Sequence, residues 1–499
     1  MRYTYLLLLI AAFAVNQDTY AQGYYADALR FSQYQFGSTA RLKGLASAQT
    51  AVGGDISSIG GNPAGLGLFT RSEFSLTTEI MQYSSKGSYF GESMNASRGK
   101  VNLNNLGAVF FVRMGKPRGQ DLKTGVISLN FGIGYNKTND FGNKLMFTAP
   151  NTQSSVANFY ADLANGYSGA LVDGSLEDAA DKANLIIPSG GNYVSATNAD
   201  RVQDEVIIRN GSQSELNLSA GINISNKFYI GTSIGLLGLK YSSDNTFTEN
   251  GTLSYTDANG NYSENYNNNY YQRFEAKGSG FNMKLGVIFR PNQYFRIGAT
   301  AQSPNWYTID DSYSESTSTN LTDNPRFQDQ RVTSETADYD LTYGLRTPAK
   351  FSLGASLFQN KIGFLTGEIE LVDYSSIELE SKDYTPNQFN DDNRFIVNNY
   401  KNATNYKIGA EVKATPTLFV RAGYSLTDSP IENSNQDLDI QTYSIGGGYR
   451  FGNINIDLAY QSSSANSQIS PYTLNTGISP VASFKTTRSG VFLTVGTRF

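Results

Sequence analysis

Apolar and polar residues alternate along most of this chain, in segments of roughly 9 to 20 residues that run from Ser72 to the end. Within residues 127–135, for example, five large apolar side chains are separated by serine, asparagine and glycine. Other clear runs are 215–224, 281–289, 406–412, 418–424 and 454–460. Successive side chains of a strand point to opposite faces, so this period of two predicts β-strands that each have one apolar face.

The connections between these segments alternate between short and long. The short ones lie near 116–123, 225–227, 291–293, 359–361, 415–417 and 452–453. The long polar ones lie near 84–100, 137–212, 242–270, 307–335, 377–402, 428–437 and 462–484. A soluble sandwich explains any single strand, but it rarely runs so long in one chain. Short turns on one side and long loops on the other are typical of an outer-membrane barrel, with the short side in the periplasm.

The predicted fold is therefore all-β: a transmembrane antiparallel β-barrel of about 14 strands. The predicted strands are 72–84, 101–115, 124–136, 213–225, 227–242, 271–290, 293–306, 336–358, 361–376, 403–415, 417–427, 438–451, 453–462 and 486–499. Pro348 lies in the eighth strand and cannot donate to a ladder, which predicts a bulge or local opening. Loop 137–212 contains two apolar patterns at helical spacing, one from Val156 to Leu163 and one from Leu176 to Ala183.

The stretch from Thr39 to Phe69 breaks the alternating pattern and is rich in small residues. Its glycine pairs allow backbone angles that side chains forbid, and proline fixes a turn after asparagine. An irregular surface loop is the alternative, but a barrel of this width leaves a lumen that some segment must fill. We therefore predict that residues 22–71 form an N-terminal hatch, or plug, inside the barrel of residues 72–499. Its motif residues are Gly53, Gly54, Asp55, Asn62, Pro63, Ala64 and Gly65.

Residues 1–21 have the features of a secretory signal peptide. Arg2 is followed by a short apolar core, and Thr19-Tyr20-Ala21 places small residues at both recognition positions, so cleavage is expected after Ala21. Together with the barrel pattern, this predicts a mature protein in the outer membrane of a Gram-negative cell.

The composition excludes several functions. The chain contains no histidine and no cysteine, so Ser-His-Asp and Cys-His catalysis are impossible. We therefore expect no enzyme activity, and we expect neither a metal site nor a cofactor. A net charge of −5 does not favour nucleic acid as a partner.

Several motifs resemble the FadL/TodX (OmpP1) family of outer-membrane transport proteins, in a Bacteroidetes-type branch. The motifs are Asp27–Ser32, Thr39–Arg41, Gly53–Ser58, Asn62–Leu66, Thr347–Lys350, Glu368–Ser376, Gly448–Phe451 and the terminal strand Val491–Phe499. The final aromatic residue, Phe499, resembles the signal by which such chains engage the barrel-assembly machinery.

This resemblance implies passive uptake of hydrophobic molecules, such as long-chain fatty acids or aromatic hydrocarbons, by a barrel in contact with outer-membrane lipids. We expect a monomer. The candidate lumen pocket comprises Phe364, Thr366, Glu368 and Glu370. Relatives release ligand sideways through a kink in the third strand, which makes Gly132 and Gly134 the candidate lateral gate, although they could equally make room for the plug. The alternative function is a barrel component of protein export, similar to PorV of type IX secretion.

Overall fold

The fold was analysed in a computed structural model of the chain. It describes residues 23–35, 37–117, 121, 123–166, 169–257, 260–323, 330–359, 362–382, 387–432, 438–475 and 477–499. The predicted signal peptide, residues 1–21, lies outside the described residues. No helix in the described ranges is long and apolar enough to cross a membrane.

Fourteen antiparallel wall strands form a closed barrel, in agreement with the predicted fold class. Three of the wall strands are interrupted, and each of these consists of two named strands. In order around the wall they are β1 (Glu73–Tyr89), β2 (Glu92–Arg113), β3 (Val126–Asp140), β7 (Val202–Ile224), β8 (Phe228–Asp257), β9 (Gly260–Phe289), β10 (Phe295–Gln302) with β11 (Trp306–Thr322), β14 (Lys350–Gln359) with β13 (Ala337–Arg346), β15 (Gly363–Asp373) with β16 (Glu378–Ser381), β17 (Asn402–Lys413), β18 (Leu418–Thr427), β19 (Ile440–Phe451), β20 (Ile454–Ile469) and β21 (Ala482–Arg498). The β1–β21 ladder, from Glu73↔Arg498 to Ser88↔Ser483, closes the wall.

An apolar belt surrounds the outside of the barrel. On β9 the side chains of Phe281, Met283, Leu285, Val287 and Phe289 are exposed in alternation with buried ones. Farther along the same strand, away from the short turns, most outward positions are polar or charged instead, as at Arg273, Glu275 and Lys277. An outward apolar band of this kind is the surface that a barrel presents to lipid.

Several strands extend much farther than predicted. Segment 242–270 was expected to be a loop, but β8 and β9 pair continuously from Phe228↔Phe289 to Asp257↔Gly260. Segment 84–100 likewise belongs to the β1–β2 hairpin. Above the membrane both faces of a strand can be polar, so these extensions lack the alternation on which the prediction relied.

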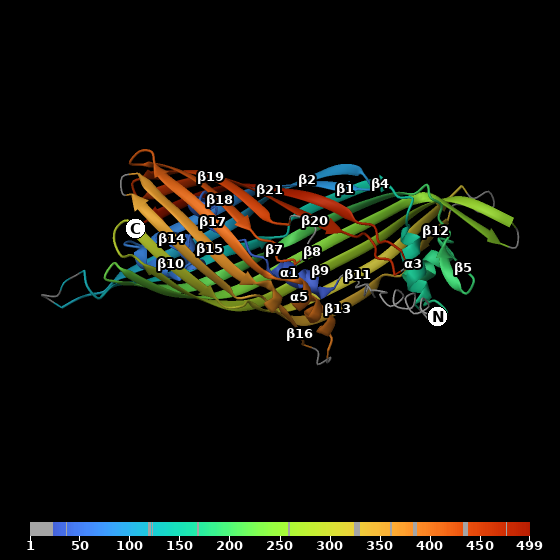
Figure 1. The fold of residues 1–499 in the computed structure, drawn as a ribbon, viewed down its shortest axis with the longest axis horizontal. Helices are drawn as coiled ribbons and strands as arrows, with labels where there is room; N and C mark the ends of the chain where they lie inside the picture. Colours follow the sequence, from blue (N-terminus) through green and yellow to red (C-terminus); the bar gives the residue numbers. More distant parts are fainter. Residues whose placement is uncertain are drawn as a thin grey trace, which may run out of the picture.

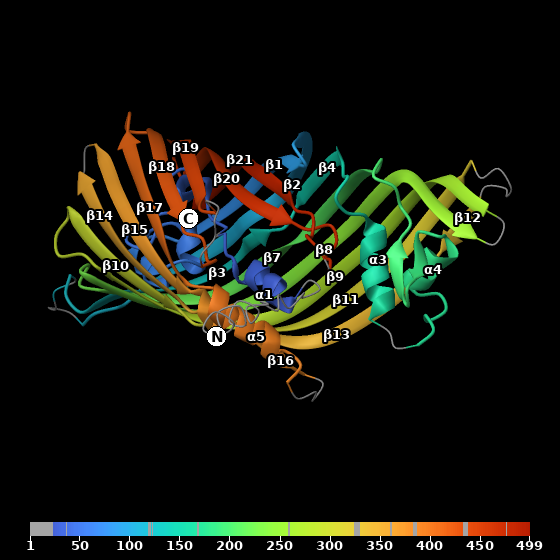
Figure 2. The same cartoon turned by 45° about the vertical axis from the view of Figure 1, so that its right-hand side comes forward.

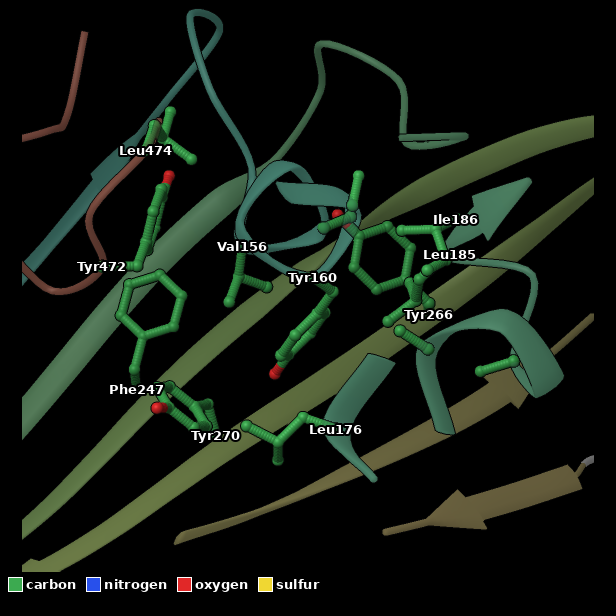
Figure 3. Close-up of a cluster of buried hydrophobic side chains, with 14 of the residues drawn as sticks. Val156, Tyr160, Leu176, Leu185, Ile186, Phe247, Tyr266, Tyr270, Tyr472 and Leu474 are labelled. Atoms are coloured by element: carbon green, nitrogen blue, oxygen red, sulfur yellow. The ribbon is translucent and has the colours of Figure 1, made fainter. Parts of the chain in front are cut away.

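The extensions carry an extracellular cap at the end opposite the short turns (Figure 1). It comprises β4 (Asn143–Pro150), α3 (Val156–Asn165), α4 (Leu176–Lys182), the small β5–β6 hairpin (Ile186–Ser189, Asn192–Ser195) and β12 (Gln330–Thr333). Both helices lie where the helical spacing predicted them. Figure 3 shows Val156 and Tyr160 of α3 among aromatic side chains that include Phe247, Tyr270 and Tyr472.

The three interrupted wall strands are neighbours. The interruptions separate β10 from β11 at 303–305, β13 from β14 at 347–349 and β15 from β16 at 374–377, where residues 374–376 form the 3₁₀ helix η3 (Tyr374–Ser376). The second break contains Pro348, which confirms the predicted local opening. Asn305 and Thr347 still connect the first two interrupted wall strands. The Asn305 amide donates to Thr347 Oγ1 and the Thr347 amide donates to the Asn305 carbonyl, both at 3.0 Å.

Candidate functional site

The hatch fills the lumen with short helices and turns. It comprises α1 (Tyr24–Ser32), α2 (Ala40–Lys43), η1 (Ile56–Ile59) and η2 (Pro63–Leu68). The η2 helix contacts β7, β8 and β9, whereas α2 contacts β19, β20 and β21 across the barrel. Figure 2 shows α1 inside the curve of the sheet beside α5 (Asn390–Asn399), with which it is in contact.

Polar side chains cap α2, η1 and η2 of the hatch. Asp55 caps η1 by accepting from the Ser57 amide at 3.0 Å, and it also accepts from Thr39 Oγ1 at 2.9 Å. Thr39 in turn caps α2. One buried carboxylate therefore ties two hatch elements together, because each of its bonds satisfies a donor that the lumen would otherwise bury.

Asn62 attaches the hatch to the wall. Its Nδ2 donates to the Thr50 carbonyl at 2.7 Å and lies within 3.3 Å of the Val287 carbonyl and 3.4 Å of the Ala299 carbonyl. Its Oδ1 accepts from the Ala64 amide at 3.1 Å, which caps η2 with Pro63 in the first turn. A single side chain thus joins two hatch segments to β9 and β10.

Glycines of the wall receive the hatch backbone. A Cβ atom added at Gly231 would lie 2.2 Å from the Pro63 carbonyl carbon, and one added at Gly298 would lie 2.1 Å from the Thr50 carbonyl oxygen. At Gly286 it would lie 1.9 Å from Asn62 Oδ1. These three inward glycines are hatch contacts that the sequence reasoning missed. Their signal is a glycine at an inward-facing position of a strand.

The predicted hatch residues come together in the structure. The Gly54 amide donates to the Gly65 carbonyl at 3.1 Å, and a Cβ atom on Gly65 would lie 3.0 Å from the Gly53 Cα. Both Gly53 and Gly54 have positive φ angles, of 58° and 66°, which glycine adopts without steric cost. The motif is therefore a compact core of the hatch; its role in transport stays a prediction.

A cavity of about 210 Å³ lies above the hatch. Its lower part is charged and contains Lys43, Lys350, Lys407, Glu368 and Glu370. Apolar side chains also line it, namely Val372, Tyr374, Pro430, Leu438 and Ile440, beside the charged Asp428. Pro430 and Leu438 belong to the β18–β19 connection, and Ile440 is the first residue of β19. The cavity lining thus combines charged and apolar side chains.

The three lysines differ in how their charges are compensated. Lys407 Nζ lies 2.9 Å from Glu368 and 3.6 Å from Glu370. Lys350 Nζ lies 3.8 Å from the centre of the Tyr34 ring and forms no ion pair with any described carboxylate. Burial, together with the charges of Lys137 and Lys407, lowers the pKa of Lys43 in the hatch to about 7. The lower part of the cavity therefore favours an anion, since Lys350 gains from one.

The predicted pocket residues on β15 have different surroundings. Glu368 accepts from the Gln49 and Thr50 amides of the hatch, at 2.8 and 2.9 Å, and Glu370 accepts from Asn405 at 2.9 Å. These two carboxylates line the cavity. Phe364 instead packs with Leu42, Leu45 and Val52 of the hatch, and Thr366 bonds to Ser356. Ligand binding by any of the four stays a prediction.

The candidate gate glycines lie beneath the hatch. A Cβ atom on Gly132 would lie 2.8 Å from Ile59 Cγ1, and one on Gly134 would lie 3.2 Å from Ile59 Cγ2. At these glycines β3 pairs with β2 on one side and with β7 on the other. The glycines therefore provide room for Ile59, and their role as a gate stays a prediction.

A second cavity, of about 440 Å³, lies at the interrupted part of the wall. Its lining includes the outward side chains Phe351 and Leu371. It shares Gln302, Lys350 and Val372 with the cavity in the lumen. The two cavities therefore adjoin at these three residues, a feature that the sequence reasoning indicated solely through Pro348.

We predict that Asn62→Leu loosens the hatch. The substitution removes the bonds to Thr50, Val287 and Ala299 without a large change of volume, so the cost is about 1–3 kcal/mol for the buried carbonyls left unpaired. Ion leak through the protein in liposomes should rise, and amide exchange in the hatch should accelerate. Asn95→Leu, on the exposed β1–β2 hairpin, is the matched control. Equal leak in the two variants would contradict the anchoring role of Asn62.

Comparison with known proteins was made by sequence and by structure. The model of a family of outer membrane protein transport proteins, OMPP1/FadL/TodX, matches residues 209–499. No curated protein matches the chain in sequence. The fold is similar to a crystal structure of the P. putida toluene transporter TodX, with 13% identity over 93% of this chain and 99% of that chain and a TM-score of 0.51. It is also similar to a crystal structure of a Pseudomonas aeruginosa FadL homologue, with 14% identity, coverage of 93% and 98%, and a TM-score of 0.54.

Proposed function

Because the chain belongs to the OMPP1/FadL/TodX family of outer membrane transport proteins, we propose that it is a passive channel for hydrophobic molecules that carry an anionic group, with long-chain fatty acids as the first candidates. The observation that carries this proposal is the cavity above the hatch, whose lining combines Lys350 with apolar side chains. A carboxylate would bind at Lys350 near the hatch, while an alkyl chain would lie against Val372, Tyr374 and Leu438. Aromatic hydrocarbons would use the apolar side chains alone.

The proposal predicts that Lys350 discriminates between head groups. Lys350→Met removes a charge that forms no ion pair among the described residues and keeps a linear side chain, so the affinity for oleate should fall about tenfold. Oleyl alcohol, which lacks the charge, should bind both proteins equally. The measurement is a titration of each probe against the purified protein in a nonionic detergent. Lys240→Met, on an exposed part of β8, is the control and should change neither affinity.

Two results would count against this function. If oleate and oleyl alcohol lose affinity to the same extent, Lys350 acts through the shape of the cavity and not through its charge. If the purified protein contains no acyl chain in a lipid-extract mass spectrum and co-purifies with secretion components, the alternative role in protein export gains support. The family match describes transport proteins and does not favour that alternative.

The exit route has two candidates. One is the predicted gate at β3, and the other is the wall of β14 and β15 next to the interruptions. A cysteine pair at Ala108 and Ile133 would lock β3 to β2, and a pair at Phe351 and Leu371 would lock β14 to β15, because both are directly opposed pairs. Crosslinks are a sharper test than Gly132→Val, since valine there would also displace Ile59 from the hatch.

We expect oxidation of the cysteine pair at the true exit to slow oleate uptake at least about tenfold, and reduction to restore it. The reason is that a disulfide keeps the two paired strands from separating. A cysteine pair at Ala410 and Ala422, which are opposed on β17 and β18, is the control and should have no effect. Uptake in liposomes or whole cells is the measurement. If neither lock slows uptake, the molecules leave through the periplasmic end of the barrel.

A further inference from the structure

A third cavity opens where the hatch meets the periplasmic ends of the strands. It measures about 310 Å³. Four arginines from separate parts of the chain line it: Arg41 of the hatch, Arg290 after β9, Arg296 of β10 and Arg450 of β19. We call these four residues the arginine pocket. No aspartate or glutamate is among the described residues that line it.

In the adjoining cavity, acidic side chains balance the charges of the arginines. It shares Arg41 and Arg450 with the arginine pocket, but its lining also contains Asp55, Glu73 and Asp457. The carboxylates near that cavity already form ion pairs. Arg421 lies 2.6 Å from Asp457 and 2.7 Å from Glu411, Glu411 also lies 2.9 Å from Arg41, and Arg498 lies 2.7 Å from Glu73. Asp55 lies 3.7 Å from Arg41. These acids therefore pair with Arg41 alone among the four residues of the arginine pocket.

Three of the four guanidinium groups lack an ionic partner. Among the described residues, Arg290, Arg296 and Arg450 form no ion pair. The charges of Arg290 and Arg41 act repulsively on Arg296. Arg450 is repelled by Arg41 and Arg498 and attracted by Glu411 and Asp457. Like charges held close together destabilise the structure, and a bound anion would reduce that cost.

Arg296 is held in place for such a contact. Its Nη1 donates to the Val52 carbonyl of the hatch, and its guanidinium lies 4.2 Å from the centre of the Phe358 ring. Its Nε is buried and has no hydrogen-bond partner. Guanidinium groups bind carboxylate and phosphate through paired hydrogen bonds, so a fixed arginine with an unused donor is suited to an anionic ligand.

The rest of the lining is suited to the beginning of an alkyl chain. Val52 and Leu68 of the hatch and Tyr229 and Phe358 of the wall share the cavity with the arginines. The surrounding periplasmic turns are also basic, since Lys116, Lys123, Lys227 and Arg290 are accompanied by Asp121 alone among their described charged residues. Such a rim raises the local concentration of anions.

We propose that the arginine pocket binds the anionic head group, carboxylate or phosphate, of an amphiphile at the periplasmic end of the hatch. The inference extends the proposed function, because a fatty acid that has passed the hatch would present its carboxylate here. The phosphate of a phospholipid from the inner leaflet presents the same chemistry. The two sources differ in the molecule that binds and can be separated by experiment.

The test uses a reporter inside the pocket. Trp306 is the only tryptophan of the chain, so Trp306→Phe with Phe358→Trp places a single fluorophore beside Arg296. Dibromostearate should quench it in the full-length protein, and Arg290→Gln with Arg296→Gln should weaken that quenching at least tenfold. Lys227→Met, on the same rim but outside the lining, should leave it unchanged. Heat-modifiable gel mobility verifies that every variant is folded.

Further probes identify the ligand class. Quenching by brominated phosphatidylglycerol, with none by dibromostearate, would assign the pocket to phospholipid; the reverse assigns it to fatty acid. Equal quenching by dibromostearyl alcohol, or equal quenching with and without the two arginines, would overturn the proposal. Repeating the titration with Lys350→Met separates the two sites. Loss of quenching only there would place the binding in the upper cavity and support the proposed function while removing this one.

Discussion

Deletion of residues 22–71 is expected to turn the protein into an open pore, with an ion conductance higher by about an order of magnitude or more. The hatch contacts wall strands on opposite sides of the lumen through η2 and α2. The inward side chains beneath it are polar, and they include Asn130, Asn217, Ser219, Ser233 and Asn282. Once the hatch is removed, water and ions can occupy the space along these side chains.

Planar-bilayer recording of the refolded variant measures this effect. Replacement of residues 255–262, at the tip of the β8–β9 hairpin, with a short glycine turn is the control, because it removes residues far from the lumen. Heat-modifiable mobility verifies that both barrels are closed. A closed barrel with unchanged conductance after loss of the hatch would show that the segment does not block the lumen.

The second large effect concerns a buried ion pair in the wall. Lys284 of β9 and Glu215 of β7 are 2% and 0% exposed, and their charged atoms lie 2.6 Å apart. The pair reaches across β8 at Gly235, where a Cβ atom would lie 2.1 Å from Glu215 Oε1. Lys284→Met leaves a buried carboxylate without its cation, which should cost about 3–5 kcal/mol of folding free energy.

The double variant Lys284→Met with Glu215→Leu should recover most of that loss, because it removes both charges and keeps apolar volume. Urea unfolding in lipid vesicles gives the two free energies. Lys182→Met, which breaks exposed pairs with Asp173 and Asp178, serves as the control and should leave the unfolding midpoint unchanged. If the double variant is as unstable as the single one, the cost arises from lost packing and not from the unpaired charge.

The sequence predicted the parts of the barrel that lie in lipid better than the parts that lie in water. The outward residues of β9 from Phe281 to Phe289 alternate because one face meets lipid and the other meets the lumen. The extensions, such as 242–257, meet water outside the membrane and show little alternation, so their sequence predicted loops although they form strands. Pro348 marked one interruption correctly because its effect on a ladder is local.

The candidate site was harder to predict for a related reason. Glu368 and Glu370 were predicted from their inward positions on one strand, and both line the cavity. The hatch glycines Gly53 and Gly54 were visible through composition. Lys350 and the arginine pocket were not, since their members come from segments far apart in the chain that only the closed barrel brings together.

The glycines that receive the hatch restrict how this protein can change by mutation. At Gly231 and Gly298 the obstacle is hatch backbone, so no change of a hatch side chain can make room for a larger residue there. At Gly286 the nearest obstacle is the Asn62 side chain, so a larger residue at position 286 requires a smaller one at position 62. Evolution of the inner wall is therefore epistatic with evolution of the hatch, whereas Leu285 on the lipid side is free to exchange with other apolar residues.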